Sequence, residues 1–399
     1  MSSVLNFSIK LLFHLSILFS ITIAADTITF SERTQIYSED PVAICDAVCA
    51  TLKKDNNNTF LFSSTAITTY KFWGPMEDPK RYSAVLSHPS SFTIPPHLQD
   101  HVTFNYVPGV TNYANIYLKN VIAIGGNELL GLLHMEYMQG FLNDYPNYPA
   151  IYRIGLCYSN NLGDSWTFCG DIIGVYNWRP MLLPGGVLND AVNIGGAANL
   201  IIGDSIYVYF NEYGLSNSTK YPSVARAKLS DVILAARNST VTTWHKYDSS
   251  SKSFTQDGID GLGSPVINKQ YLDVHTDAAY CRHLKQYMLL VRDIIGKGLF
   301  LYRSTDGISW SHKQKVASDT IVNEKDRFPV YPFFASISGD ANSVSSIVGK
   351  EFYIYYINAY FRPEEEGLGQ RTDLPLHRVK VNVNAPSLFS EPVLNTFFD

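Results

Sequence analysis

Two short segments of this sequence follow the same turn pattern, and they constrain the fold more than any other feature. Residues 159–166 read SNNLGDSW and residues 304–310 read STDGISW. In this pattern, called an Asp box, Ser and Asp side chains bond the turn backbone, Gly supplies unusual dihedral angles and Trp packs beneath. The second copy is complete, whereas the first has Asn161 where Asp is usual. Both segments therefore predict turns that close β-hairpins.

Strand-like runs fill much of the remaining chain. They are short, rich in Ile, Val, Tyr and Phe, and separated by turn residues such as Gly and Asn. We expect strands at 59–67, 128–137, 151–159, 205–213, 286–292, 298–304 and 351–358. The one good helical pattern is 230–237, with Ser230 as its N-cap. Strands without alternating helices argue against a parallel βαβ sheet and favour a sandwich, barrel or propeller.

The spacing of the two boxes selects among these folds. They lie about 140 residues apart, which fits two blades of about 70 residues, so about 370 residues hold five blades. We therefore predict an all-β protein, a five-bladed β-propeller with four antiparallel strands per blade. The blades are expected at 46–96, 116–173, 192–247, 275–316 and 333–381, with a terminal segment closing the ring. Residues 26–399 form one domain in this prediction.

The N-terminus has the layout of an export signal. Lys10 precedes an apolar run at 11–23, and the small residues Ala24 and Ala25 follow. A helix needs about 20 residues to span a bilayer, and this run is shorter, which argues against a retained membrane anchor. We expect a signal peptide at 1–25 and a secreted, extracellular protein. Three Asn-x-Ser/Thr sequons, at Asn57, Asn217 and Asn238, suit a secreted glycoprotein.

The charge of the chain excludes some partners. It has 31 basic and 36 acidic residues, a formal charge of −5, and no basic stripe. Nucleic acid and anionic membranes are therefore poor partners, and we expect a monomer. Aromatic residues make up 13% of the chain, with 26 Tyr and 22 Phe. Such a content suits a β-rich core, and it also suits a groove in which sugar rings stack.

Five cysteines allow disulfide bonds in an exported protein. Cys157 and Cys169 flank the first Asp box, and a hairpin there would place them opposite each other, so we predict a bridge between them. The odd number leaves at least one thiol unpaired within the chain. A pairing of Cys281 with Cys45 or with Cys49 remains open.

The functional face follows from propeller geometry. The first strand of each blade begins at the top and the second returns there, so functional residues are expected at these two positions, whereas the Asp boxes lie at the bottom. The acidic residues that meet this condition are Asp46, Glu136, Asp190 and Asp277. Other polar residues expected to face the same funnel are His134, His275, Arg292 and Glu212. His134 alternates onto the face of Glu136, as Asp273 and His275 do with Asp277.

Converging carboxylates suit the hydrolysis of a glycosidic bond. One carboxylic acid protonates the leaving oxygen, while another activates water or attacks the anomeric carbon. Crowding of like charges raises one pKa and keeps that group protonated. The alternative is that each carboxylate caps a turn or pairs with an Arg or Lys.

The two Asp boxes and the five-blade length resemble the five-bladed propeller glycosidases, which include arabinanases, β-xylosidases, invertases and levansucrases. The segments 224–232, 244–247 and 261–264 resemble uncharacterised secreted proteins of this type. The resemblance implies Asp46 as base or nucleophile, Glu136 as the acid or its partner, and Asp190 or Asp277 as the third carboxylate. Asp40, in an Asp-Pro pair, competes with Asp46. No invertase-type WxNDPNG and no Arg-Asp-Pro triplet is present.

Three alternatives stay open beside this carbohydrate hydrolase. A sialidase would also contain Asp boxes, but the Tyr152-Arg153-Ile154-Gly155 segment runs directly into an Asp box instead of lying near the N-terminus. A non-catalytic, lectin-like propeller would bind glycans through aromatic residues. His134, His275 and the aspartates would alternatively hold a metal at the channel mouth, although no tight ligand spacing supports it. We expect no cofactor and no metal.

Overall fold

The fold was analysed in a computed structural model of the chain. It describes residues 26–37, 47–52, 58–64, 69–75, 88–93, 113–138, 151–174, 194–213, 220–322, 325–337, 346–360 and 376–384. Strands dominate these residues, as the sequence predicts, and the predicted strands at 151–159, 205–213 and 298–304 have the bounds observed. No helix in the described ranges is long and apolar enough to span a bilayer.

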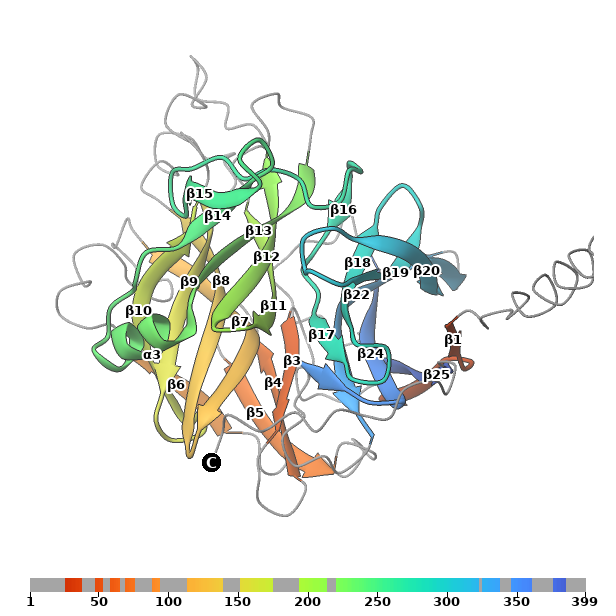
Figure 1. The fold of residues 1–399 in the computed structure, drawn as a ribbon. Coiled ribbons are helices and arrows are strands. Elements are labelled where there is room, and N and C mark those ends of the chain that lie inside the picture. Colours follow the sequence, from red (N-terminus) through yellow and green to blue (C-terminus); the bar gives the residue numbers. More distant parts are fainter. Residues whose placement is uncertain are drawn as a thin grey trace, which may run out of the picture.

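The strands of the described residues form four sheets (Figure 1). One sheet contains β1 (Thr27–Phe30), β2 (Thr34–Tyr37), β21 (Thr320–Val322), β22 (Lys325–Ser336), β24 (Glu351–Tyr360) and β25 (Leu376–Asn384). An eight-stranded sheet contains β3 (Ala47–Leu52), β4 (Asn58–Ser64), β5 (Thr69–Pro75), β6 (His88–Thr93), β7 (Tyr113–Gly125), β8 (Glu128–Met138), β9 (Ile151–Ser159) and β10 (Ser165–Ile173). A third sheet contains β11 (Gly195–Ile202), β12 (Ser205–Tyr213), β13 (Lys220–Lys228), β14 (His245–Asp248) and β15 (Ser253–Asp257). The fourth contains β16 (Leu272–Asp273), β17 (Ala278–Cys281), β18 (Gln286–Asp293), β19 (Gly298–Ser304), β20 (Ser311–Ser318) and β23 (Ile347–Val348).

The predicted count of five separate blades is wrong, because the described strands form four sheets. The difference lies in the eight-stranded sheet, which consists of two antiparallel runs, β3–β6 and β7–β10. Their outer strands β6 and β10 pair in parallel, with Ser91 opposite Ser165 and Thr93 opposite Thr167. This pairing uses two strand edges that would otherwise present unpaired backbone groups, and it joins the two runs into one sheet.

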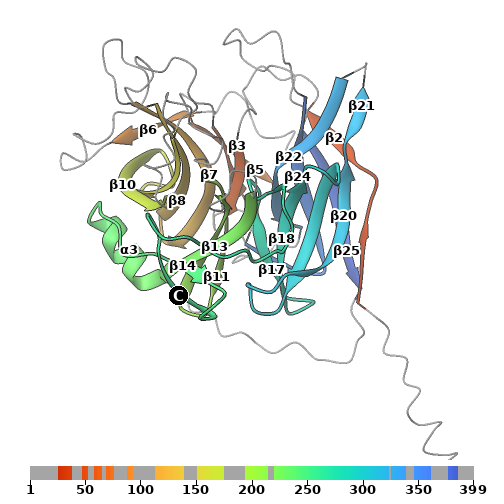
Figure 2. The same ribbon diagram turned by 90° about the horizontal axis from the view of Figure 1, so that it is seen from above.

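The sheets have a propeller arrangement around a central region. Among the described strands, β3, β7, β11, β17 and β22 each pack against the next, and β22 also packs against β3 (Figures 1 and 2). The eight-stranded sheet supplies both β3 and β7, so four sheets provide five inner strands. The outer strand β1 pairs antiparallel with β25. The N-terminal strand therefore joins the sheet that also contains β25, near the other end of the chain.

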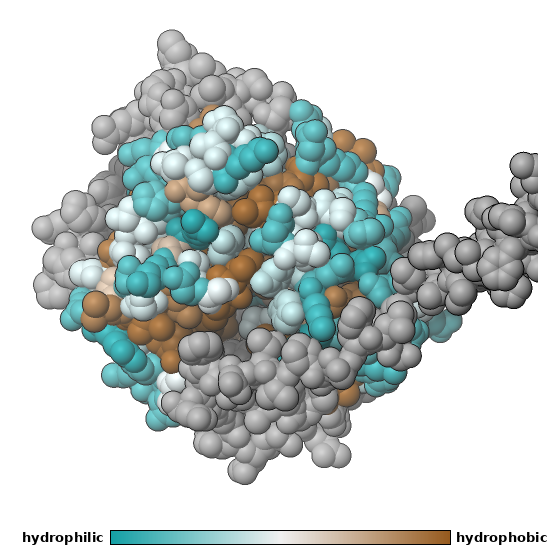
Figure 3. Space-filling model, in the orientation of Figure 1, coloured by the Kyte–Doolittle hydropathy of each residue, from teal (hydrophilic) through white to brown (hydrophobic). Residues whose placement is uncertain are grey.

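The core lies between the sheets and consists mainly of aliphatic and aromatic side chains. One cluster joins the β11–β15 sheet to the β16–β20 sheet through residues such as Tyr209, Val224, Leu289 and Phe300. Figure 3 shows that apolar residues reach the surface along this boundary. Full burial of each such side chain contributes about 1.5–3 kcal/mol, so packing between sheets dominates the stability of the arrangement.

The first Asp box forms the turn between β9 and β10. Ser159 Oγ accepts hydrogen bonds from the backbone N–H of Gly163 (2.9 Å) and of Asn161 (3.3 Å). Asn161 Oδ1 accepts from the backbone N–H of Ser165 at 3.0 Å, which is the bond that Asp would make. Gly163 has a φ of +82°, and Trp166 beneath the turn is 1% exposed. Asn161 therefore replaces Asp without loss of the turn.

The second Asp box forms the turn between β19 and β20. Ser304 Oγ accepts from the N–H of Gly307 at 2.8 Å, and Asp306 Oδ1 accepts from the N–H groups of Ile308 and Ser309 at 2.8 and 2.7 Å. Trp310 packs edge-on against Tyr209 of the neighbouring sheet, with ring centroids 5.4 Å apart. Both turns are confirmed as hairpin closures with a structural role.

The helix α3 (Leu229–Arg237) lies between β13 and β14 and begins one residue before the predicted helix. The prediction that Ser230 is its N-cap is wrong. The N-cap is Lys228, which makes no side-chain capping bond, and Ser230 Oγ bonds Asp231 instead. The helix starts where the N–H of Leu229 donates to the carbonyl of Asp204, so a tertiary contact fixes this end.

The predicted Cys157–Cys169 disulfide is also wrong, because both residues are buried free thiols. The strand register explains this result. Cys157 pairs with Phe168, and the register shifts between Phe168 and Gly170, which places Cys169 in a β-bulge. Cys157 packs in the core cluster of Trp166 and Phe168, whereas Cys169 packs in a different cluster with Ile172. The two thiols therefore lie on opposite faces of the sheet.

Cys281 is likewise a buried free thiol, and its Sγ donates to the carbonyl of Gly349 at 3.5 Å. Cys45 and the side chain of Cys49 lie outside the described residues. The signal segment 1–25 and the sequons at Asn57 and Asn217 lie outside them too.

Candidate functional site

Two of the predicted polar residues, His134 and His275, meet although they belong to different sheets. His134 is near the end of β8, and His275 lies between β16 and β17. Their ring centroids are 5.2 Å apart at an interplanar angle of 78°. Tyr152 packs edge-on against His134 at 4.9 Å, and Tyr117 lies 5.9 Å away. Imidazole and phenol rings from three strands and a loop therefore form one cluster, which we call the His134–His275 cluster.

A carboxylate fixes the ring of His275. Asp273 Oδ1 lies 2.5 Å from Nδ1 of His275, and it also accepts the backbone N–H of His275 at 3.0 Å. Asn211, at the end of β12, donates from Nδ2 to the same oxygen at 2.8 Å. The side chains of Asp273 and His275 are 23% and 20% exposed, whereas Asn211 is fully buried. Asp273, itself bonded to Asn211, thus holds the imidazole on its Nδ1 side, while part of the His275 side chain stays exposed.

Gly195 provides the space for this ring. A Cβ atom at this position would lie 2.0 Å from Cε1 of His275, which no side chain tolerates. Gly195 is the first residue of β11, so the imidazole lies directly over the backbone of an inner strand. In the sequence this space corresponds to the Gly195-Gly196 pair that begins β11.

Asp277 does not join the His134–His275 cluster through any bond that it makes in the described residues. Its Oδ2 accepts the backbone N–H of Phe334 on β22 at 3.0 Å, and its Oδ1 accepts that of Ala278 at 2.9 Å. The carboxyl is 2% exposed, and burial raises its pKa to about 7 although these two backbone bonds favour the charged form. Asp277 therefore ties β17 to β22 at the inner ring, and it titrates close to neutrality.

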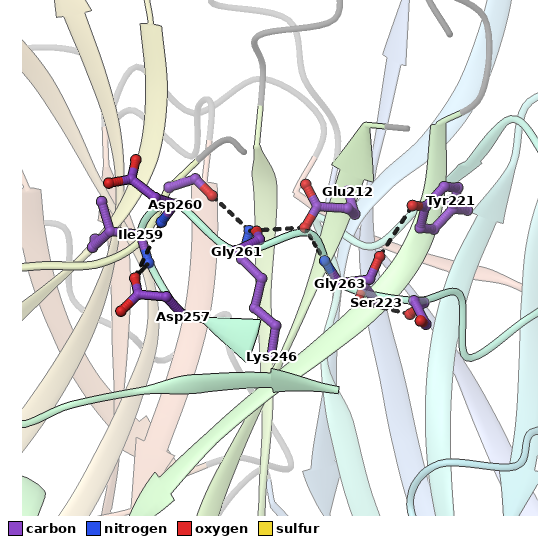
Figure 4. A network of polar contacts seen from close by, with 11 residues as sticks. Glu212, Tyr221, Ser223, Lys246, Asp257, Ile259, Asp260, Gly261 and Gly263 are labelled. Atoms are coloured by element: carbon purple, nitrogen blue, oxygen red, sulfur yellow. Dashed lines mark hydrogen bonds and ion pairs between the residues drawn. The ribbon is translucent and has the colours of Figure 1, made fainter. Parts of the chain in front are cut away.

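Glu212 is part of a buried network that links β12 and β14 of the third sheet to the segment 257–264 (Figure 4). Its carboxylate accepts from Lys246 Nζ at 2.8 Å and from the backbone N–H of Gly263 at 3.0 Å, and both charged side chains are 0% exposed. Lys246 also donates to the carbonyls of Gly174 and Gly261, each at 2.7 Å. The network anchors the segment around 257–264 to the sheet, which is a structural task.

Arg292 is also occupied by internal bonds. Its guanidinium donates to the carbonyls of Asp293 (2.8 Å) and Gly298 (3.1 Å), and to Asp319 Oδ2 at 2.8 Å. These partners lie at the turn between β18 and β19 and at the end of β20. Arg292 therefore braces one end of the fourth sheet, and none of these bonds involves the two histidines.

The side chains of the remaining predicted carboxylates lie outside the described residues. Asp46, its rival Asp40 and Asp190 lie outside the described residues. The backbone of Glu136 is described, on β8 two residues after His134 and opposite Tyr152 of β9, but its side chain is not. Glu136 thus occupies the end of a second strand, the position that the prediction assigned to it.

Two of the alternative interpretations find no support in the described residues. Arg153, the arginine of the sialidase-like segment, pairs with Asp171 of β10 at 3.0 Å. Within the described ranges, no group of three or more His, Cys, Asp or Glu side chains is arranged to hold a metal ion.

The sequence pattern gives no indication of Asn211, and it shows Asp273 only as one of the residues that alternate with Asp277. Asp273 was visible in the alternation of ionisable residues before β17. Asn211 carried no signal, because a single Asn at the end of a strand is typical of a turn. Only the packing of the third sheet against the fourth shows that it supports Asp273.

No protein-family model matches this chain, and no curated protein matches it. Several solved structures are similar in fold. A thermostable family-43 glycoside hydrolase is 11% identical, with a TM-score of 0.46, and the match covers 90% of this chain and 100% of that one. The catalytic domain of a Coprinopsis cinerea GH62 α-L-arabinofuranosidase is 11% identical, with a TM-score of 0.43 and coverage of 90% and 96%. A family 117 glycoside hydrolase from the marine bacterium Zobellia galactanivorans is 8% identical, with a TM-score of 0.45 and coverage of 92% and 93%. These likenesses do not assign a reaction to this chain.

Proposed function

We propose that this protein is a secreted, monomeric, single-domain glycoside hydrolase that acts on an extracellular carbohydrate at the His134–His275 cluster. The observation that carries the proposal is this cluster, in which two imidazoles and two tyrosine rings converge from three strands and a loop and one imidazole is oriented by Asp273. Aromatic faces and fixed polar groups together suit a sugar ring, which has apolar faces and hydroxyl edges.

The catalytic carboxylates are part of the same proposal. Hydrolysis needs one carboxylic acid for the leaving oxygen and one carboxylate for water or for the anomeric carbon. We assign Glu136 as the acid and Asp46 as the base or nucleophile, with Asp190 or Asp277 as the third member. The position of Glu136 two residues beyond His134 supports its assignment. The buried Asp277, with a pKa near 7, suits a group that tunes the charge of its neighbours.

The test is hydrolysis of a panel of aryl glycosides and polysaccharides by the purified mature chain. Wild type is compared with Asp46→Asn and Glu136→Gln, and with Asp248→Asn, which changes a carboxylate bonded to Ser250 in the turn between β14 and β15. Turnover that falls by about 100-fold or more in the first two variants and not in the control supports the proposal. A wild-type chain without turnover on the whole panel contradicts it.

A non-catalytic glycan-binding propeller is the second candidate. One observation favours it: Glu212 and Arg292, two of the predicted funnel residues, are used in internal bonds, and Asp273 already accepts three hydrogen bonds on one oxygen. Binding of a panel glycan without turnover, unchanged by Glu136→Gln, would support this candidate over the hydrolase.

A further inference from the structure

The helix α3 exposes an apolar side chain beside the third Asn-x-Ser/Thr sequon. The helix buries Val232 and Ala236, which are four residues apart and therefore lie on one face. Leu234 is midway between them in the sequence, so it points to the opposite face, and it is 64% exposed. Asn238, the acceptor of the sequon, lies four residues beyond Leu234 and is exposed as well. The outer side of α3 therefore presents an apolar group next to a glycosylation acceptor.

The orientation of α3 is fixed by an ion pair at its last turn. Arg237 donates from Nε to Oε1 of Glu128 at 2.8 Å, which ties this turn to the first residue of β8. A rotation that buried Leu234 would break the pair and would expose Val232 and Ala236 to water. Leu234 therefore stays exposed as long as the fold is intact.

The sequon forms a tight turn that leaves the amide of Asn238 open to substitution. Nδ2 of Asn238 donates to the carbonyl of Leu234 at 2.8 Å, and an amide nitrogen has two hydrogens. Replacement of one hydrogen by a sugar leaves the other for this bond. Ser239 has a φ of +57°, and Thr240 donates to the carbonyl of Ala235 from its backbone N–H (3.0 Å) and its hydroxyl (3.1 Å). The acceptor is thus held at the surface by bonds that a glycan does not have to break.

A second apolar side chain, Val241, follows the sequon directly. It is 36% exposed, and it lies against Gly170 of β10, where a Cβ atom would be 3.3 Å from Cγ1 of Val241. Five large apolar side chains are exposed in the described part of the chain, and Leu234 and Val241, which lie within four residues of Asn238, are two of them. Apolar groups gathered at one place on a surface mark a site that another group covers. A sugar ring attached to Asn238 has apolar faces suited to this task.

We propose that Asn238 carries an N-linked glycan whose first sugar ring packs over Leu234 and Val241. The donor is a lipid-linked oligosaccharide diphosphate. The bond from C1 of its first sugar to Nδ2 of Asn238 forms, the bond from C1 to the diphosphate oxygen breaks, and the lipid diphosphate takes up the amide proton. The glycan covers the apolar outer side of α3 and keeps the chain monomeric.

The inference takes secretion from the proposed function and uses none of its catalytic residues. Figure 1 shows α3 at the periphery of the molecule, where it packs against β9 and β13, away from the inner strands β11 and β17. A glycan at this place leaves the His134–His275 cluster open.

The first test is the occupancy of Asn238. The whole chain is secreted by a eukaryotic host, and its peptides are analysed by mass spectrometry before and after N-glycanase, which converts a glycosylated asparagine to an aspartate. We expect a glycan on Asn238 in wild type and in Thr240→Ser, which keeps both the sequon and the hydroxyl, and none in Thr240→Ala. An unmodified Asn238 in the secreted wild type overturns the inference. A glycoside panel without turnover contradicts only the hydrolase, because the mass of this peptide still decides the glycan.

The second test concerns the covering of Leu234. Size-exclusion chromatography measures the monomer fraction of Thr240→Ser, of Thr240→Ala and of the double variant Thr240→Ala/Leu234→Lys at rising protein concentration. We expect Thr240→Ala to lose monomer to larger species, and the double variant to stay as monomeric as Thr240→Ser, since Lys suits an exposed helix position. Because both Thr240→Ala proteins lack the same hydroxyl, their difference isolates the apolar side chain. Asn238→Gln replaces Thr240→Ala in this comparison if the latter does not fold. A glycan-free variant that stays as monomeric as Thr240→Ser overturns the covering role.

Discussion

Asn211 and Glu212 are neighbours on β12, and because side chains alternate along a strand they serve two different regions. Asn211 donates a hydrogen bond to Asp273, which orients His275, whereas Glu212 forms a buried ion pair with Lys246 of β14. Both regions contain a carboxylate bonded to a nitrogen base, and both are held by backbone groups. The Glu212–Lys246 pair maintains the fold, whereas the Asp273–His275 pair lies at the proposed ligand site.

The two regions differ in how far their charged side chains are exposed. An ammonium group has three donors, and Lys246 uses them on Glu212, Gly174 and Gly261, with 0% exposure of both charged side chains. In the second pair the imidazole is 20% exposed and lies among aromatic rings. A fully buried pair fixes loops, whereas a partly exposed pair is in contact with solvent, as a ligand-binding group must be.

The largest effect is expected from Glu212→Gln. It leaves the buried ammonium of Lys246 without its counter-charge, and the free energy of unfolding should fall by about 3–5 kcal/mol. Urea unfolding followed by fluorescence measures this change. The double variant Glu212→Gln/Lys246→Met should recover part of the loss, since it removes the unpaired charge. A loss below about 1 kcal/mol in the single variant would contradict the structural role of the pair.

Asp277→Asn should have a smaller effect that depends on pH. The variant loses one acceptor for a backbone N–H, which costs about 1–3 kcal/mol. In the fold the pKa of Asp277 is raised from 3.8 to about 7, so its protonated form favours folding below about pH 4 and this contribution is lost as the pH rises through about 7. The variant lacks that dependence. Urea unfolding between pH 4 and pH 7 should therefore show the two stabilities converging by about 1 kcal/mol or more as the pH rises. Parallel curves would show that Asp277 does not titrate there.

The variant Asp273→Asn tests the second of the two regions, around His275. Because Asp273 is partly exposed, its loss should lower the free energy of unfolding by about 1 kcal/mol or less. The same substitution should reduce turnover about tenfold or more on the preferred glycoside. Thermal unfolding and kinetics on one protein preparation measure both. A stability loss as large as that of Glu212→Gln would make the two regions equivalent and remove the distinction.

The smallest effect is expected from Asn161→Asp in the first Asp box. The carboxylate keeps the bond from the backbone N–H of Ser165, and the hydroxyl of Ser165 is able to donate to the new oxygen. The free energy of unfolding should change by less than about 0.5 kcal/mol. A change above about 2 kcal/mol would show that the Asn amide is required in this turn.

The sequence predicted the elements whose cause is local. The strands and both Asp boxes were found because alternating apolar residues and the Ser, Asp, Gly and Trp of the turns act within one hairpin. The Cys157–Cys169 disulfide failed because one bulge residue, invisible in the pattern, moves Cys169 to the other face. The count of five separate blades failed because the parallel pairing of β6 with β10 is a contact between distant strand edges.

The candidate site was predicted only in part for the same reason. His134 and His275 were expected on one face, and their rings meet although they belong to different sheets. Glu212 and Arg292 satisfied the same positional rule, yet their side chains bond inward to Lys246 and Asp319. The rule gives the end of a strand but not the side to which a residue points. Asn211 and Glu212, one residue apart, show how much depends on that choice.

The most direct test of the account is a histidine spectrum recorded while a glycan binds. The Glu136→Gln variant, which the proposal expects to be inactive, is labelled with ¹⁵N-histidine and titrated with the oligosaccharide that wild type cleaves best. We predict that the ring signals of His134 and His275 shift in proportion to occupancy, while those of the exposed His245 on β14 stay unchanged. Saturable binding that leaves His134 and His275 unchanged would contradict the assignment of this cluster as the carbohydrate site.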